Sequence, residues 1–126
     1  MKFVIKVKED PKYTERNIDI EFPIYRKIVQ NGIDDVVCKN YYKIDKAEKL
    51  KHKNIYGNLY RLIMTKISIF TNCNVKTVLE FNVDYTFAKS IDKNGFDFIV
   101  GSGAFSSSKE EFENAISKAA EILTLL

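Results

Sequence analysis

The sequence predicts an α+β fold: an antiparallel sheet of about six strands in meander-like hairpins, covered on one face by a long C-terminal helix. Two patterns carry this prediction. Apolar and polar residues alternate from Thr77 to Phe87, the period of a half-buried strand, and apolar residues recur at helical spacing from Phe112 to Leu126. No linker, low-complexity run or internal repeat divides the chain, so we expect residues 1–126 to form a single domain.

Three strands are expected in the first 44 residues. The first covers 3–7, where apolar residues alternate with outward-facing lysines, and the second covers 18–24. Proline has no N–H to donate to a ladder, so Pro23 makes the second strand an edge or introduces a bulge. A turn at Gln30-Asn31-Gly32 leads to the third strand, over 36–44. Edge strands beside Pro23 or at the N-terminus would be free to pair with another chain.

The pattern between residues 45 and 70 is ambiguous. Apolar spacing over 55–67 suits a helix, but the run from Ile67 to Phe70 is rich in strand formers and ends at a turn signal. We therefore expect a strand over 60–70 that pairs with the strand at 75–88. A short helix from Lys46 to Asn54, capped by Asp45, is expected before it.

A hairpin and a helix are expected at the C-terminal end. Asn94-Gly95 is a favoured dipeptide for a tight hairpin turn, and Phe96, Phe98 and Val100 would lie on the returning strand. Ser108, followed three residues later by Glu111, fits a capping box. The pattern therefore predicts a helix over 108–125 that packs on the sheet.

Composition excludes several classes of protein. The formal net charge of +3 gives no global footprint for nucleic acid, and no segment has the roughly 18 apolar residues of a membrane span. Cys38 and Cys73 lack a CxxC spacing, which favours two reduced thiols in a cytoplasmic protein over one disulfide in a secreted protein. Lysine outnumbers arginine 17 to 3, a bias of AT-rich coding sequences. That bias fits a phage or mobile-element origin, with the host cell or a virion as the location.

Charge is unevenly distributed along the chain. Residues 39–61 hold seven basic residues, two acidic residues and four of the seven tyrosines. Strand parity places Lys39, Tyr41 and Lys43 on one face, where charge would attract phosphates and tyrosine rings could stack on bases. The candidate binding surface, which we name the Lys/Tyr segment, comprises Lys39, Tyr41, Lys43, Lys49, Lys51, Lys53, Tyr56 and Arg61.

The Lys/Tyr segment has a second interpretation. Lysines also make an exposed strand soluble, and tyrosines commonly bridge the edge of a sheet and its core. Arginine, which grips phosphates in bidentate fashion, occurs in this segment only as Arg61. Any nucleic-acid binding here would therefore be sequence-independent and sensitive to salt.

Other motifs have structural explanations beside the chemical ones. The segment 101–109 could hold an anion at a helix start, but it lacks the GxxxxGK[ST] spacing and suits a turn with a helix cap. Glu80 and Asp84, with Asp97 across the predicted hairpin, could act as paired carboxylates, yet they alternate with polar residues on a solvated face. His52 stands between two lysines, which discourage a metal ion.

These observations predict no catalytic residues, no metal and no cofactor. The leading hypothesis is a non-catalytic interaction or structural module that acts through its surface, such as a phage or mobile-element accessory protein. Its partner would be another protein or further copies of itself, and no membrane is involved. The alternative is a sequence-independent nucleic-acid-binding domain that uses the Lys/Tyr segment. A third class, the binder of a small apolar ligand, requires a cavity between helix and sheet, which a filled core would exclude.

Overall fold

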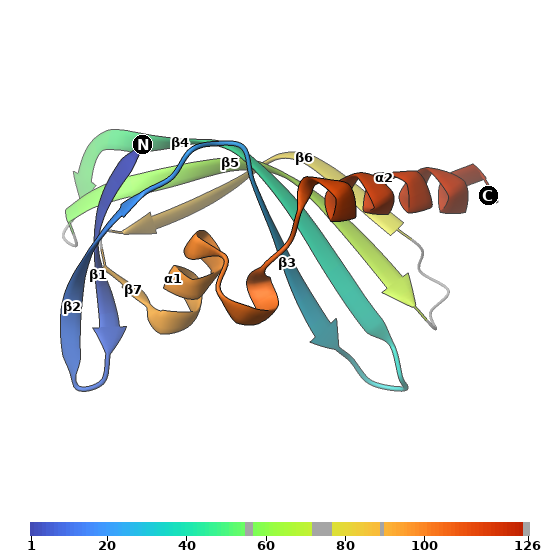
Figure 1. Ribbon diagram of the computed structural model, residues 1–126, viewed down its shortest axis with the longest axis horizontal. Helices are drawn as coiled ribbons and strands as arrows, with labels where there is room; N and C mark the ends of the chain where they lie inside the picture. Colours follow the sequence, from blue (N-terminus) through green and yellow to red (C-terminus); the bar gives the residue numbers. More distant parts are fainter. Residues whose placement is uncertain (55–56, 72–76, 89, 125–126) are drawn as a thin grey trace.

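The computed structural model describes residues 1–54, 57–71, 77–88 and 90–124, and this part of the chain forms two β-sheets and two α-helices (Figure 1). The α+β class, the predominantly antiparallel pairing and the C-terminal helix are confirmed. The described residues contain seven strands in two sheets, however, where the sequence predicts about six in one sheet.

The larger sheet is a four-stranded antiparallel meander in the order β3-β4-β5-β6. Its strands are β3 (Ile24–Asn31), β4 (Val37–Asn54), β5 (Gly57–Thr71) and β6 (Thr77–Ala88). The smaller sheet has the order β2-β1-β7. It contains β1 (Lys2–Glu9), antiparallel to β2 (Lys12–Asp19) and parallel to β7 (Ser90–Asp92). The predicted pairing of 60–70 with the following strand is confirmed.

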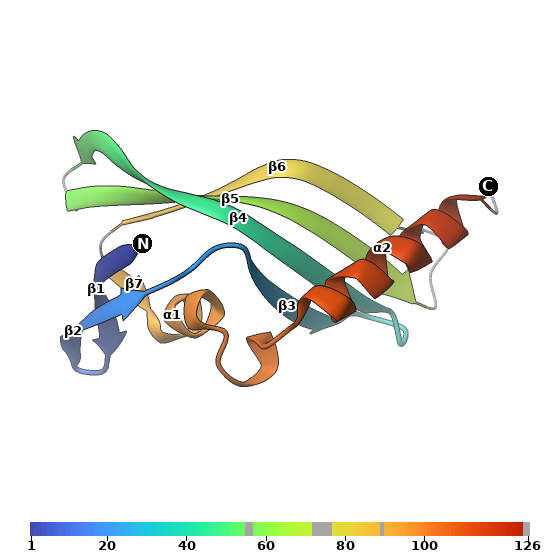
Figure 2. The ribbon, with the colours of Figure 1, turned by 45° about the horizontal axis from the view of Figure 1, so that its top comes forward.

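Two apolar cores lie on opposite faces of the larger sheet. The inner face arches over α1 (Lys93–Val100) and the smaller sheet, and there Phe3, Leu62 and Ile99 are fully buried (Figure 1). The outer face carries α2 (Lys109–Thr124), which Figure 2 shows along one end of the sheet. Buried alanines and Phe112 of α2 pack there on β5, so the helix predicted over 108–125 is confirmed within the described residues.

The hairpin predicted at Asn94-Gly95 is wrong, because this segment begins α1. The Asp92 side chain accepts a hydrogen bond of 2.7 Å from the Gly95 backbone N–H and thereby caps the helix. Phe98 and Ile99 are buried on one side of the helix. The Asn-Gly dipeptide is also compatible with the first turn of a helix when an Asp at the N-cap satisfies the free N–H group.

The helix predicted from Lys46 to Asn54 is also wrong, since β4 continues to Asn54. Ala47 pairs with Leu62 of β5 and packs against the inner core, and this pairing favours extended backbone over a short isolated helix. The strand predicted over 18–24 is divided as well. β2 ends at Asp19 and β3 begins at Ile24, so Pro23 lies in the connection where the chain passes from one sheet to the other.

The N-terminal strand is not an edge, contrary to the sequence prediction. β1 lies between β2 and β7, since β2 returns beside it and β7 adds on its other side. The apolar residues Phe3, Ile5 and Val7 are fully buried, and Lys2, Lys6 and Lys8 are exposed as predicted. The strand that follows Pro23, β3, does lie at an edge of the larger sheet.

Arg26 of β3 joins the larger sheet to α1. Its Nε lies 2.8 Å from the Phe98 carbonyl oxygen, and its Nη2 lies 2.7 Å from the Ile99 carbonyl oxygen. These carbonyls belong to the last turn of α1, which lacks helical partners for them. Burial lowers the pKa of the Arg26 guanidinium from its ordinary value, but an arginine stays charged in proteins. A cation at the negative end of the helix dipole is stabilising.

Gly101 makes the approach of Arg26 possible. It ends α1 in the left-handed conformation (φ 75°), and its N–H donates to the Asp97 carbonyl oxygen at 2.8 Å. A Cβ at this position would lie 2.6 Å from Cζ of Arg26. The sequence Gly101-Ser102-Gly103 therefore serves the end of α1 and the turn that follows it.

We predict that Arg26→Met lowers the free energy of unfolding by about 2–3 kcal/mol, because it leaves the last carbonyls of α1 buried without a donor. Arg16→Met is the matched control. Arg16 makes an exposed ion pair of 2.8 Å with Glu9, and its loss should cost about 0–1 kcal/mol. Urea unfolding followed by circular dichroism measures both values. Equal losses in the two variants would contradict the anchoring role of Arg26.

Candidate functional site

The Lys/Tyr segment begins on the outer face of the larger sheet. Tyr41 pairs with Ile67 across β4 and β5, so Lys39, Tyr41 and Lys43 lie on the same face, as strand parity predicts. This face also carries α2, and Tyr41 packs against the apolar core beneath that helix. Burial, followed by the charge of Glu111, raises the pKa of the Tyr41 hydroxyl. Tyr41 is therefore partly occupied by helix packing, while Lys39 is exposed.

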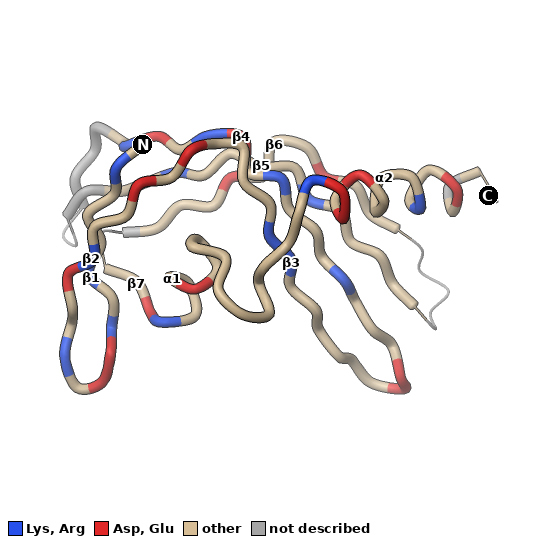
Figure 3. The backbone as a smooth tube through the Cα atoms, viewed as in Figure 1, with Lys and Arg blue, Asp and Glu red and all other residues tan. Residues whose placement is uncertain are grey.

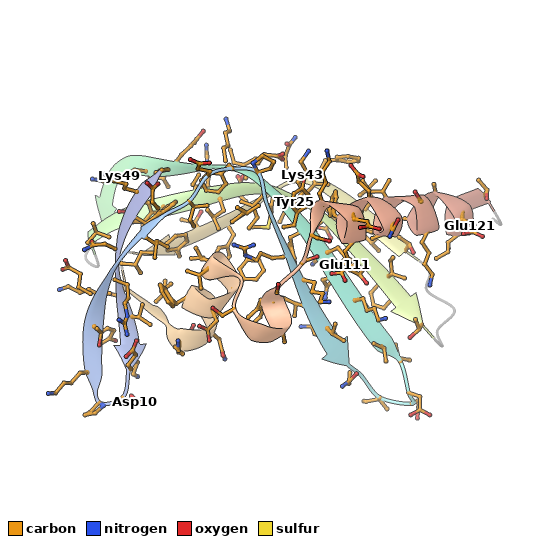
Figure 4. All side chains as sticks on the ribbon, in the orientation of Figure 1. Asp10, Tyr25, Lys43, Lys49, Glu111 and Glu121 are labelled. Carbon is orange, nitrogen blue, oxygen red and sulfur yellow. The ribbon has the colours of Figure 1, made fainter. Side chains whose placement is uncertain are left out.

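Acidic residues of the chain compensate several cations around this face. Glu111 in the first turn of α2 lies 3.2 Å from Lys27 Nζ and accepts a 2.7 Å hydrogen bond from the Ser107 hydroxyl. The Ser107 hydrogen bond, with that of Lys27, lowers the pKa of the Glu111 carboxyl. Figure 4 shows Glu111 and Tyr25 where α2 begins over the sheet. On β4 itself, Lys43 Nζ lies 3.7 Å from an oxygen of Asp45.

A bulge divides the rest of the segment between the two faces. The β4–β5 register shifts between Ile44 and Lys46, after which Lys49 pairs with Tyr60, a residue of the inner core. Lys49 therefore projects to the side opposite Lys43, and Figure 4 shows the two lysines far apart along β4. The predicted strip does not continue along one face.

Arg61 is already engaged. Its Nη2 lies 2.6 Å from Oε2 of Glu48, whose other carboxylate oxygen lies 3.2 Å from Lys46 Nζ. Figure 3 shows basic and acidic residues interleaved along this part of β4. The side chains of Lys51 and Lys53, the whole of Tyr56 and the side chain of His52 lie outside the described residues. Of the described cations in the Lys/Tyr segment, Lys39, Lys43 and Arg61 thus lie on the outer face and Lys49 lies on the opposite face.

The segment 101–109 caps helices at both ends. Gly101 terminates α1, and the Ser108 hydroxyl accepts a 3.1 Å hydrogen bond from the Glu111 N–H at the start of α2. Segment 101–109 is therefore a turn with helix caps, as one of the two interpretations of the sequence predicts. Asp97 is not on a hairpin with Glu80 and Asp84, because it lies on α1, where Lys93 Nζ is 3.0 Å from its carboxylate.

The edge of β6 is a surface that the sequence did not predict. Among the described strands, β6 has a neighbour on one side only, and its 12 residues include no lysine or arginine. Phe81 is 69% exposed, and three further apolar side chains of this strand are exposed, namely Val78, Leu79 and Tyr85. The sequence assigns Leu79, Phe81 and Tyr85 to one buried face. That assignment is wrong for Leu79 and Phe81, because a bulge interrupts the alternation. Tyr85 does lie on the inner face, opposite Leu62.

The bulge lies at Phe81 and Asn82. These two residues stand opposite Thr65 alone, where the β5–β6 register shifts, and Asn82 adopts a left-handed conformation with φ 55°. Asparagine tolerates this conformation better than most residues. Beyond the bulge, Val83 and Phe87 pack in the inner core, whereas Leu79 pairs with Ile67 on the outer face.

A groove of about 430 Å³ lies between the inner face and α1. The groove reaches from the β6 edge across the sheet, and Phe98 meets Phe105 within it at a ring distance of 5.9 Å. Burial and then the charge of Asp92 raise the pKa of the Tyr85 hydroxyl at its rim. The lining residues are Ile28, Tyr42, Met64, Lys66, Val83, Asp84, Tyr85, Asp92, Asn94, Gly95, Phe98 and Phe105. The groove was not expected from the sequence, because the residues of α1 are predicted there to form a strand.

No protein family, curated relative or solved structure matches the chain. Within the part of the chain that the structure describes, no helix combines the length and the apolar character needed to cross a membrane. The same residues contain no group of three or more His, Cys, Asp or Glu side chains that could hold a metal ion. A proposal for function therefore has to rest on the β6 edge, the groove and the Lys/Tyr segment.

We predict that Glu111→Gln makes the free energy of unfolding less dependent on pH in the acidic range. The folded-state pKa of Glu111 lies below its unfolded value, so its contribution is present above the unfolded pKa and is lost as pH falls through the folded pKa. Chemical unfolding measured from about pH 6 to about pH 3 should give a shallower decline for the variant. Glu113→Gln, on the exposed side of α2, is the control. Identical slopes for Glu111→Gln and the control would contradict the ion-pair geometry.

Proposed function

We propose that this chain is a non-catalytic protein-interaction module whose contact surface is the edge of β6. The observation that carries the proposal is the exposure of large apolar side chains, above all Phe81, on a strand with one open side. Such an edge presents unpaired backbone N–H and C=O groups, and an extended segment of another chain can pair with them. Natural proteins usually protect long edges with lysine, proline or a covering element.

The other described edges are better protected than β6. β2 carries exposed charged residues along its length, including Lys12, Glu15 and Arg16. β3 is bridged at Arg26 by Ser106, next to the 3-10 turn η1 (Gly103–Phe105), and β7 is three residues long. In Figure 3, most of β6 is free of charged residues. This contrast supports β6 as the site of association.

The nucleic-acid alternative has weaker support. Lys49 lies on the face opposite Lys39, Lys43 and Arg61, and Lys43 and Arg61 already have acidic neighbours. Binding through Lys39 and Lys43 would appear as salt-sensitive affinity for oligonucleotides that is lost when both lysines are changed to Glu. That result would replace the proposal made here.

The proposed setting is an accessory protein of a phage or mobile element, acting in the host cytoplasm or in a virion. The Cys38 thiol is free, which suits a reducing compartment. A homo-oligomer is one form that the association could take, with β6 of one copy beside β6 of another. The proposal requires no enzymatic step.

We predict that peptides selected by this protein from a displayed random library lose their binding when Phe81 and Thr86, both exposed on β6, are changed to Lys. Lysines on an edge strand block pairing without entering the core. The matched control changes Ile33, which is 85% exposed, and Asn114 to Lys, and so adds the same charge away from β6. Sedimentation velocity on the same variants tests self-association.

Binding or self-association that the β6 lysines remove and the control retains would support the module. A chain that stays monomeric and selects no peptide would contradict it. Peptides that bind the β6 variant as well as the wild type would place the contact on another surface. Circular dichroism shows whether each variant is folded.

A further inference from the structure

We infer that the segment received by β6 is an extended peptide with an apolar side chain that enters the inner groove, flanked by lysine or arginine. This inference rests on the proposed function and adds the chemistry of the partner. Three features support it. They are the position of the bulge in β6, the aromatic lining of the groove beside the β6 edge, and the acidic residues on β6 and at the groove.

The bulge defines where a peptide can pair. At Phe81 and Asn82 the regular ladder is interrupted, so the regular stretch of edge that follows runs over 83–87. Five residues of strand span about 17 Å, enough for a short extended peptide. This stretch is also the part of β6 that borders the groove, through Val83, Asp84 and Tyr85.

The groove offers a receptor for one side chain of such a peptide. In a strand added beside β6, alternate side chains would point toward the inner face, where Val83 and Phe87 pack. The groove lies on that face, between the β6 edge and the first turn of α1 at Asp92 and Gly95. Its volume of about 430 Å³ falls in the range of small-ligand sites.

The lining of the groove favours an apolar or aromatic side chain. Phe98 meets the rings of Tyr85 and Tyr42 in edge-to-face geometry, at 6.4 Å and 5.3 Å between centroids. Met64 and Val83 add aliphatic surface. Aromatic pairs of this geometry and a flexible methionine suit an inserted ring. A groove beside an open strand, lined this way, is the arrangement by which peptide-binding sheets obtain side-chain specificity.

The charges favour a basic partner. Glu80 and Asp84 are exposed on β6, Asp92 is exposed at the opposite wall of the groove, and Lys66 is the single cation in the lining. Neither Glu80 nor Asp84 forms a salt bridge with another described residue. Lysine or arginine beside the anchor would lie on the same side as Asp84, which stands opposite Ile63, and would compensate its carboxylate. A second copy of β6 would bring the same acidic residues together, and phosphates of nucleic acid would be repelled.

Two displayed libraries of strand-patterned peptides test this chemistry. In both, alternate positions are drawn from Val, Ile, Leu, Phe, Tyr and Trp, and the intervening positions are Lys or Arg in one library and Asp or Glu in the other. The wild-type protein should enrich the basic library at least about 10-fold over the acidic one, since like charges across a contact disfavour binding. Asp84→Lys should remove or reverse this preference.

Two matched variants complete the design. Asp10→Lys makes the same charge change at the β1–β2 turn, far from β6 in Figure 4, and should keep the wild-type preference. Asn94→Trp places a ring at the groove, whereas Asn114→Trp places one on exposed α2. Asn94→Trp should weaken binding of the enriched peptides at least about 10-fold, because Asn94 lines the groove. Asn114→Trp should leave binding unchanged, because Asn114 lies outside the groove.

The outcomes separate this inference from the proposed function. Peptides that need an open β6 edge but come equally from both libraries, or that bind Asn94→Trp unchanged, would overturn the inference and leave the edge as the contact surface. Enrichment of the acidic library would overturn it as well. Failure of both libraries and of the unrestricted library would overturn the inference and the proposed function together. Self-association through β6, with no peptide bound, would make a second copy the partner and would also overturn the inference.

Discussion

The structure depends on a partly buried cation, the guanidinium of Arg26. It joins β3 of the larger sheet to the last carbonyls of α1, an element that follows the smaller sheet in sequence. Through these hydrogen bonds Arg26 ties the end of α1 to β3 beneath the arch of the larger sheet. Phe98 then contacts Tyr42 and Tyr85, and the space left beside these rings is the groove. The same side chain therefore contributes to stability and to the shape of the candidate site.

Bulges decide what each face of the larger sheet presents. In β4, the register shift after Ile44 sends Lys49 to the side opposite Lys43 and divides the basic strip. In β6, the register shift at Phe81 and Asn82 places Val83 and Phe87 in the inner core and leaves Phe81 exposed to solvent. A single inserted residue reverses the side on which every later residue lies, because strand side chains alternate with a period of two. The candidate surfaces are consequences of these two insertions.

Much of the fold could be predicted from periodicity, and the candidate site could not. The long helix, β1 and the pairing of β5 with β6 follow from apolar spacing that their burial confirms. The hairpin prediction at Asn94-Gly95 is wrong because these residues begin α1, which the Asp92 side chain caps through the Gly95 N–H. The same residue spacing is compatible with a tight turn, so the sequence alone does not distinguish the two. The exposure of Phe81 depends on a bulge and on the position of β6 at the edge of the sheet. Both are set by strand pairing, which the local sequence pattern of β6 does not reveal. Strand parity did place Lys39, Tyr41 and Lys43 together, but it gave no sign that α2 shares their face.

Hydrogen–deuterium exchange with and without a selected peptide tests the role of the β6 edge most directly. Pairing of an added strand should slow exchange of backbone amides over 83–87, because N–H groups that face solvent would then donate to the peptide. Exchange in β2 should be unchanged. Protection confined to the outer face around Lys39 and Lys43, or no protection in β6 when the peptide is bound, would contradict the assignment of β6 as the contact surface.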